Sequence, residues 1–127
     1  MSPPPLRIDR LSQARALFAG LARAEGEVAG VAYLGVDAQV VGLRLIAGGA
    51  DQVSVPPRTL TLDALAFGAE GVIVAHNHPS GDPAPSRHDL DHARSLARAL
   101  ALMDVRLVDH LIVTAHATTS LRAMGVV

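Results

Sequence analysis

The residues best suited to chemistry lie in one segment of the chain, from His76 to Asp89. His76 and His78 are separated by one residue, and they follow an apolar run that favours a strand. Because side chains alternate between two faces in an extended segment, both imidazoles are expected to point to the same side. Imidazole nitrogen is a common zinc ligand, so the spacing favours a metal site built on this pair.

A third ligand follows a short distance along the chain. Asp89 falls in the first turn of an expected helix that begins at Ser86, where its carboxylate could face the two histidines. Two histidines and one aspartate leave a fourth position for water, as in catalytic rather than structural zinc sites. The chain contains no cysteine, so thiolate ligands are excluded.

Hydrolysis at such a site also requires a general base that takes a proton from the attacking water. A Glu or Asp side chain beside the metal would serve. Nothing in composition or spacing selects one of the 12 acidic side chains, so the identity of the base stays open at this point.

Ser86 and Asp89 also have a structural interpretation. Ser-x-x-Asp at the start of a helix is close to a capping box, in which the serine oxygen accepts a hydrogen bond from a backbone N–H of the first turn. The two interpretations are compatible, because a cap at Ser86 would fix the helix and hold Asp89 in its first turn.

The elements that must position these residues are those of an α/β domain with a curved mixed β-sheet flanked by helices. Residues 72–75 form an unbroken apolar run, typical of a central strand buried on both faces, and a loop rich in Pro and Gly follows at 77–85. The other expected elements are a helix over 9–25 ending near Gly26, a hairpin of strands 27–35 and 40–47, a short strand around Val53 and Val55, a helix from Leu60 closed by Gly71, a helix from Ser86 to about Met103, a strand over 105–114 and a helical turn at 121–124. Residues 1–8 are predicted to be a disordered lead-in, and 9–127 a single domain.

Composition limits the class of protein. The 127 residues suffice for one domain, and with 50% hydrophobic but only 2% aromatic residues the core is expected to be aliphatic. The net charge is −1, and no segment concentrates basic side chains, so the charge does not favour nucleic-acid binding. The lack of cysteine is typical of a reducing compartment, and no signal peptide or membrane span is recognisable; we expect a cytoplasmic protein without membrane contact.

The pattern His76-x-His78, seven residues, Ser86, two residues, Asp89 resembles the signature of the JAMM (MPN-type) metalloproteases. The wider sequence is more similar still to the RadC branch of that family. Residues 54–58, 74–83 and 109–113 resemble RadC segments in the same order, and the likeness spans roughly residues 27–114.

The resemblance implies a cytidine-deaminase-like JAMM/MPN fold and a zinc-dependent metallopeptidase or isopeptidase, with Zn²⁺ held by His76, His78 and Asp89. It also implies that Glu27, at the start of an early strand, is the general acid/base, and that Ser86 helps to stabilise the oxyanion of the tetrahedral intermediate. The implied partner is a peptide or protein substrate, including one joined to a ubiquitin-like modifier. The motif indicates the class of reaction and leaves the substrate and the oligomeric state open.

Two features depart from the family pattern. RadC proteins usually carry an N-terminal helix-hairpin-helix region, whereas the 26 residues before Glu27 leave space for a single helix. DNA binding attributed to that region is therefore not carried over. Pro56 stands at a position that is commonly aromatic in the family, which bears on the shape of the local loop rather than on the chemistry.

The sequence also allows interpretations other than a hydrolase. The chain could be a non-catalytic RadC-like module that acts in DNA processing or partner binding, whereas an HNH nuclease is not favoured because its motif letters are scattered rather than contiguous. Single histidines are more often core or surface residues than ligands, which is the expectation for His88, His92 and His116. His110, in a family-like Asp-His pair, is expected to play a structural role or to support a ligand rather than to bind the metal.

Overall fold

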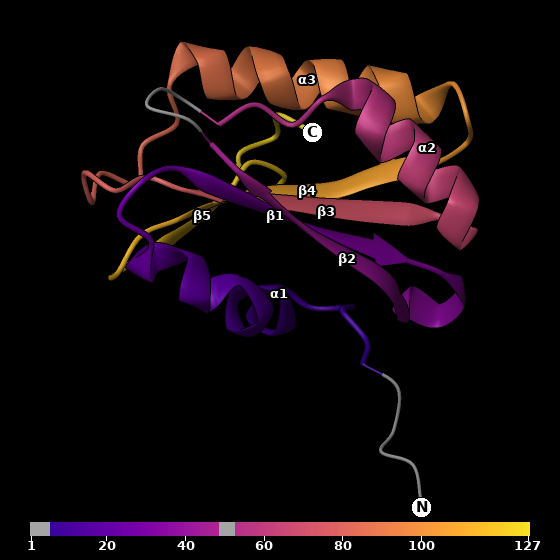
Figure 1. Cartoon of the computed structure of the whole chain (residues 1–127), viewed down its shortest axis with the longest axis horizontal. Helices are drawn as coiled ribbons and strands as arrows, with labels where there is room; N and C mark the ends of the chain where they lie inside the picture. Colours follow the sequence, from indigo (N-terminus) through magenta and orange to yellow (C-terminus); the bar gives the residue numbers. More distant parts are fainter. Residues whose placement is uncertain (1–5, 49–52) are drawn as a thin grey trace, which may run out of the picture.

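The computed structural model describes residues 6–48 and 53–127 and has a central β-sheet with helices on both faces (Figure 1). The α1 helix covers one face, and α2 and α3 cover the other. The α/β class and the mixed sheet flanked by helices are therefore confirmed. The elements in chain order are α1 (Leu11–Phe18), a 3₁₀ helix (Ala19–Arg23), β1 (Val28–Leu34), a 3₁₀ turn (Val36–Ala38), β2 (Val40–Ala47), α2 (Pro57–Phe67), β3 (Gly71–Asn77), α3 (Arg87–Ala101), β4 (Arg106–Val113) and β5 (Thr118–Ser120).

Within the described residues the sheet has five strands in the order β2-β1-β3-β4-β5. Among the described strand pairs, only β3 and β4 are parallel, and the chain passes from one to the other through α3, because a parallel pair requires a crossover connection. Every residue of β3 is buried, which confirms the predicted central strand. The loop that leaves the carboxyl end of β3 carries His78 and leads directly to the start of α3.

Each face of the sheet has its own aliphatic core. Val31 and Val74 pack with Leu60 of α2 and Leu96 of α3 on one face, and the other face packs against α1. Phe18 of α1 lies on Gly30, where an added Cβ would come within 2.8 Å of the ring. Glycine at this position therefore allows the close approach of α1 to β1.

Two helices differ in extent from the sequence prediction. The first was expected to run to residue 25, but α1 ends at Phe18 and continues as a 3₁₀ helix containing Gly20, a weak helix former. The helix α2 is closed by Gly68 in the left-handed conformation (φ 64°), whose N–H bonds to carbonyls of the last turn. The predicted closure at Gly71 was wrong, because that glycine begins β3.

The short strand predicted around Val53 and Val55 is absent at these described positions. The N–H of Val55 donates to Nε2 of His92 on α3 (3.1 Å) rather than to a neighbouring strand. The β5 strand was not expected from the sequence, whereas residues 121–125 form the turn that was expected at 121–124.

The predicted division into a lead-in of residues 1–8 and a single domain stays a prediction, since residues 1–5 lie outside the described residues. Backbone hydrogen bonds join Ile8 to Ala38 and Leu6 to Val40. In the described part of the chain, no helix has both the length and the apolar character needed to span a membrane.

A bulge in β4 determines which way its polar residues face. Val72 of β3 pairs with Leu107, but Ile73 pairs with Asp109, so Val108 is an extra residue in the ladder. An extra residue reverses the alternation of the side chains that follow. Asp109 consequently faces α1, and His110 faces α2 and α3.

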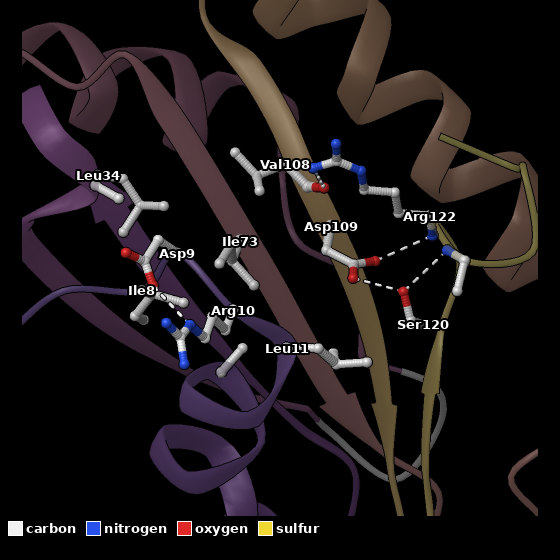
Figure 2. A pocket seen from close by; sticks show the side chains of 13 residues that line it. Ile8, Asp9, Arg10, Leu11, Leu34, Ile73, Val108, Asp109, Ser120 and Arg122 are labelled. Atoms are coloured by element: carbon white, nitrogen blue, oxygen red, sulfur yellow. Dashed lines mark hydrogen bonds and ion pairs between the residues drawn. The ribbon is translucent and has the colours of Figure 1, made fainter.

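The carboxylate of Asp109 lines a cavity of about 590 Å³ on the α1 face (Figure 2). It accepts hydrogen bonds from the Ser120 hydroxyl (2.6 Å) and from the Arg122 N–H (3.1 Å). These bonds attach β5 and the turn that follows it to β4. The polar contacts of Asp109 are thus structural and lie on the opposite face from the side chain of His110.

Candidate metal centre

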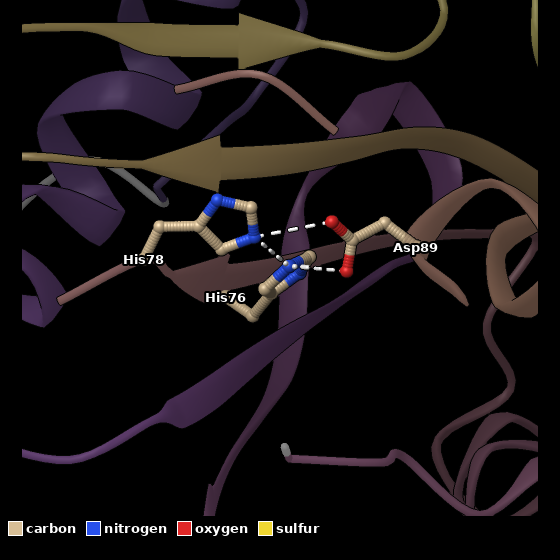
Figure 3. A group of neighbouring side chains, drawn as sticks. All are labelled: His76, His78 and Asp89. Carbon is tan, nitrogen blue, oxygen red and sulfur yellow. Dashed lines mark hydrogen bonds and ion pairs between the residues drawn. The ribbon is translucent and has the colours of Figure 1, made fainter. Parts of the chain in front are cut away.

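Three predicted ligands come together at the carboxyl end of β3 (Figure 3). Nε2 of His76 lies 3.1 Å from Oδ1 of Asp89, and Nε2 of His78 lies 3.1 Å from Oδ2. The two Nε2 atoms are 3.2 Å apart. Tetrahedral zinc with bonds of about 2.0–2.1 Å would place its ligand atoms about 3.3 Å apart, so the spacing fits one bound ion.

The centre is largely buried. The side chains of His76 and Asp89 are 7% and 6% exposed, whereas that of His78 is 16% exposed. His78 is therefore the ligand closest to solvent, and access to the centre is expected on its side.

The loop after β3 orients His78. Its Nδ1 lies 2.9 Å from the carbonyl oxygen of Asp82, and Gly81, at φ 85°, forms the tight turn that brings the loop back. Because a carbonyl oxygen only accepts hydrogen bonds, this contact favours the neutral tautomer of His78 that carries its proton on Nδ1 and a lone pair on Nε2. This is the form of histidine that ligates a metal.

The start of α3 fixes Asp89 by a capping box. The Ser86 hydroxyl oxygen accepts from the Asp89 N–H (3.1 Å), and the Ser86 N–H donates to Oδ2 of Asp89 (2.7 Å). Burial raises the pKa of Asp89, but hydrogen bonds from His76 and Ser86 outweigh burial and hold it well below its usual value. Asp89 is therefore held as a carboxylate, the form that binds metals.

His110 contacts a ligand and lies outside the set of three. Its Nε2 is 2.9 Å from Nδ1 of His76, and the residue is 1% exposed. Burial, together with the neighbouring imidazoles of His76 and His92, lowers the pKa of His110 to about 3. The lowered pKa favours the neutral ring of His110, and its expected part in supporting a ligand stays a prediction.

Glu27 lies just before β1, at the same end of the sheet as the three ligands. Ala29 pairs with His76 across the two strands, so the chain before Ala29 runs beside His78. Among the described residues, none forms a side-chain hydrogen bond or ion pair with Glu27, and its carboxylate is not part of the cluster. The roles of Glu27 and Ser86 in catalysis stay predictions.

Asn77 is a residue whose part in the site the sequence did not reveal. It is 1% exposed, its Oδ1 accepts from the Val28 N–H (2.8 Å), and its Nδ2 donates to the Gly26 carbonyl (3.0 Å). The two bonds hold the backbone on both sides of Glu27. The sequence signal that could have indicated this role was the place of Asn77 between His76 and His78. In a strand, that place directs its side chain away from theirs.

Residues 8–126 match the family described as RadC-like JAB domain. The chain belongs to this family. A UPF0758 protein of Cupriavidus taiwanensis is 50% identical over 82 residues, which are 65% of this chain and 36% of that protein. A UPF0758 protein of Polaromonas sp. is 41% identical over 100 residues (78% and 45%), and one of Carboxydothermus hydrogenoformans is 37% identical over 94 residues (73% and 42%). The chain spans less than half the length of these relatives.

The remaining histidines of this RadC-like JAB domain lie outside the metal cluster, as expected. His88 and His92 stack on α3 with ring centroids 5.7 Å apart, and His92 holds the Val55 segment by its hydrogen bond. His116 is exposed beyond the end of β4. The described residues thus place one group of three side chains that could hold a metal ion in the domain, at the carboxyl end of β3.

Proposed function

We propose that this RadC-like JAB domain is a zinc-dependent hydrolase that cleaves amide bonds in a peptide or protein substrate. The observation that carries the proposal is the cluster of His76, His78 and Asp89, whose ligand atoms are 3.1–3.2 Å apart with no cysteine in the chain. When bound, the metal would lower the pKa of a water molecule and polarise the carbonyl group of the substrate.

The cluster is prepared for a cation before one binds. The contact of Nδ1 with the Asp82 carbonyl favours a lone pair on Nε2 of His78, and the backbone N–H of Ser86 favours the ionised form of Asp89. Metal binding normally competes with protons for its ligands. That competition is reduced at these two residues.

Glu27 is the proposed general base. It lies at the start of β1, where the bonds of Asn77 hold the backbone on each side, and it is half-buried. A carboxylate there would take a proton from the attacking water and return it to the leaving amine.

Ser86 is the proposed oxyanion donor. Its oxygen accepts the Asp89 N–H, and a hydroxyl used as an acceptor keeps its own hydrogen for donation. The cap and the donor are therefore compatible roles, and the cap would fix the position of the hydroxyl relative to Asp89.

The test combines elemental analysis with turnover of an amide substrate panel, on protein purified without chelators or a nickel column. The wild type is expected to hold about one zinc ion per chain, in keeping with the one cluster of three candidate ligands found among the described residues. His76→Ala and Asp89→Ala are expected to lose the ion. Zinc at full stoichiometry in both ligand variants would refute the assigned site.

Glu27→Gln tests the general base. It should keep the ion and lose turnover by roughly 10²–10⁴-fold, the usual contribution of a general base. Glu25→Gln is the matched control, because Glu25 is exposed and only two residues away, and it should retain wild-type turnover. Wild-type turnover in Glu27→Gln would contradict the assigned role of Glu27. A wild type that holds zinc but cleaves no amide would favour the non-catalytic binding module.

A further inference from the structure

The contact between His76 and His110 has two possible proton arrangements. A neutral imidazole has one N–H, and the two rings share one hydrogen bond between Nδ1 of His76 and Nε2 of His110 (2.9 Å). If His110 donates, the single proton of His76 lies on Nε2, directed at Oδ1 of Asp89 (3.1 Å). If His76 donates, its Nε2 carries a lone pair.

Only the second arrangement allows His76 to bind a metal, because its Nε2 is the nitrogen that faces Asp89 and His78. We propose that His110 is a positioning residue that accepts the Nδ1 proton of His76 and so fixes His76 in its metal-binding tautomer. The inference rests on the metal centre of the proposed function and concerns how that centre is held.

The environment of His110 suits this role. Carboxylates commonly orient metal-bound histidines, but the neighbouring Asp109 faces the other side of the sheet and bonds to Ser120 and Arg122. An imidazole therefore occupies the place beside His76 where a carboxylate is common. Unlike a carboxylate, it adds no negative charge beside the three ligands. It offers one acceptor atom, Nε2, to Nδ1 of His76.

The assigned tautomer has a cost at the other ring nitrogen of His110. Nδ1 of His110 is buried and has no hydrogen-bond partner among the residues that the structure describes. With Nε2 acting as acceptor, the proton of His110 must lie on this Nδ1, as a buried N–H without a partner. Such groups are rare in proteins because they are costly, and they are found where function requires them.

The bulge in β4 is what brings His110 to this position. Without the extra residue at Val108, the alternation of β4 would turn His110 toward α1 and Asp109 toward the face that carries His76. Bulges that redirect a side chain are frequent beside functional sites. The local backbone is thus arranged to present an imidazole to His76.

The first test measures zinc affinity at fixed pH by competition with a chromophoric chelator. His110→Leu, which keeps an apolar side chain of similar size, should bind zinc about 10–100-fold more weakly, as is usual when the partner of a ligand is removed. His110→Gln should restore most of the affinity, because its side-chain carbonyl can accept the His76 proton. Leu111→Val, at a buried neighbour on the α1 face, should bind like the wild type.

The second test identifies the protonated nitrogens by ¹⁵N NMR of the histidine rings in the zinc-loaded wild type. The proposal requires the proton on Nδ1 of both His76 and His110. A proton on Nε2 of His110 would overturn it, and so would wild-type zinc affinity in His110→Leu. The NMR result does not depend on whether the leucine variant folds.

The two proposals fail in different ways. Zinc binding that depends on His110, together with no hydrolysis of any amide, would refute the proposed hydrolase and leave the role of His110 intact. Zinc-dependent hydrolysis that is unchanged in His110→Leu would refute the role of His110 and leave the proposed hydrolase intact.

Discussion

Replacing Asn77 by alanine should separate the position of Glu27 from the binding of metal. The side chain of Asn77 joins the end of β3 to the backbone at Gly26 and Val28. Its removal leaves the ligands on β3 and α3 unchanged and releases the segment that carries Glu27. We therefore expect zinc content to be preserved and turnover to fall.

The cost in stability follows from the two hydrogen bonds, at 2.8 and 3.0 Å. Each contributes about 0.5–1.5 kcal/mol, and the Val28 N–H and Gly26 carbonyl lose their partner in a partly buried place. The sum is about 2–3 kcal/mol for Asn77→Ala. For a chain of this length that corresponds to a decrease in Tm of roughly 10 °C.

The assay is urea denaturation of the apo protein. Zinc content and turnover are then measured at a temperature well below the Tm of the least stable variant. Ser120→Ala is the matched control, because it removes a buried hydroxyl bond to Asp109 (2.6 Å) on the opposite face at a comparable cost. It should lose stability while keeping turnover. A stability change below about 0.5 kcal/mol in Asn77→Ala, or turnover equal to that of Ser120→Ala, would refute the reasoning.

Three further predictions concern stability. Hydrogen bonds, chiefly from Arg44 and also from Tyr33, lower the pKa of the Asp63 carboxyl group. The stability that these bonds contribute is present above about pH 4 and is lost as the pH falls through the lowered pKa. Asp63→Asn should reduce Tm at pH 7, and calorimetry should show the difference from wild type shrinking on acidification; an unchanged difference would contradict the coupling. Ser86→Ala should lose about 1 kcal/mol in urea denaturation, and Ser86→Asp should recover stability without turnover because it caps the helix but has no hydroxyl. Zinc at 100 times its Kd should stabilise the wild type by about 2.7 kcal/mol, reversibly with a chelator, and should not stabilise Asp89→Ala.

The parts of the site that the sequence predicted correctly depend on local patterns. The apolar run at 72–75 is a buried strand because β3 is covered on both faces, and Ser86 caps α3 because its partner is three residues away. The spacing of His76 and His78 gave the shared direction of the two rings, since alternation in a strand needs no tertiary information. The position of Asp89 near the two histidines was predicted from its place in the first turn of α3.

The strand predicted at Val53 and Val55 failed because the deciding partner is distant in sequence. Val53 and Val55 have the composition of a strand, but the Val55 N–H is satisfied by a side chain 37 residues away, on α3. The three residues of β5 pair with β4 and are too short for a periodic signal. Asn77 likewise acts on backbone 49 and 51 residues earlier, a contact that no local spacing indicates.

His110 is the clearest case of this dependence. Counting alternate residues along β4 from the buried Leu107 assigns His110 to the α1 face, away from the metal ligands. The extra residue at Val108 reverses that assignment, and with it the faces of Asp109 and His110. Because the bulge exists only through the pairing of β4 with β3, the sequence placed His110 in a family-like pair without indicating which of the two residues would reach His76. The contact between His110 and His76 is therefore determined by the register of two parallel strands.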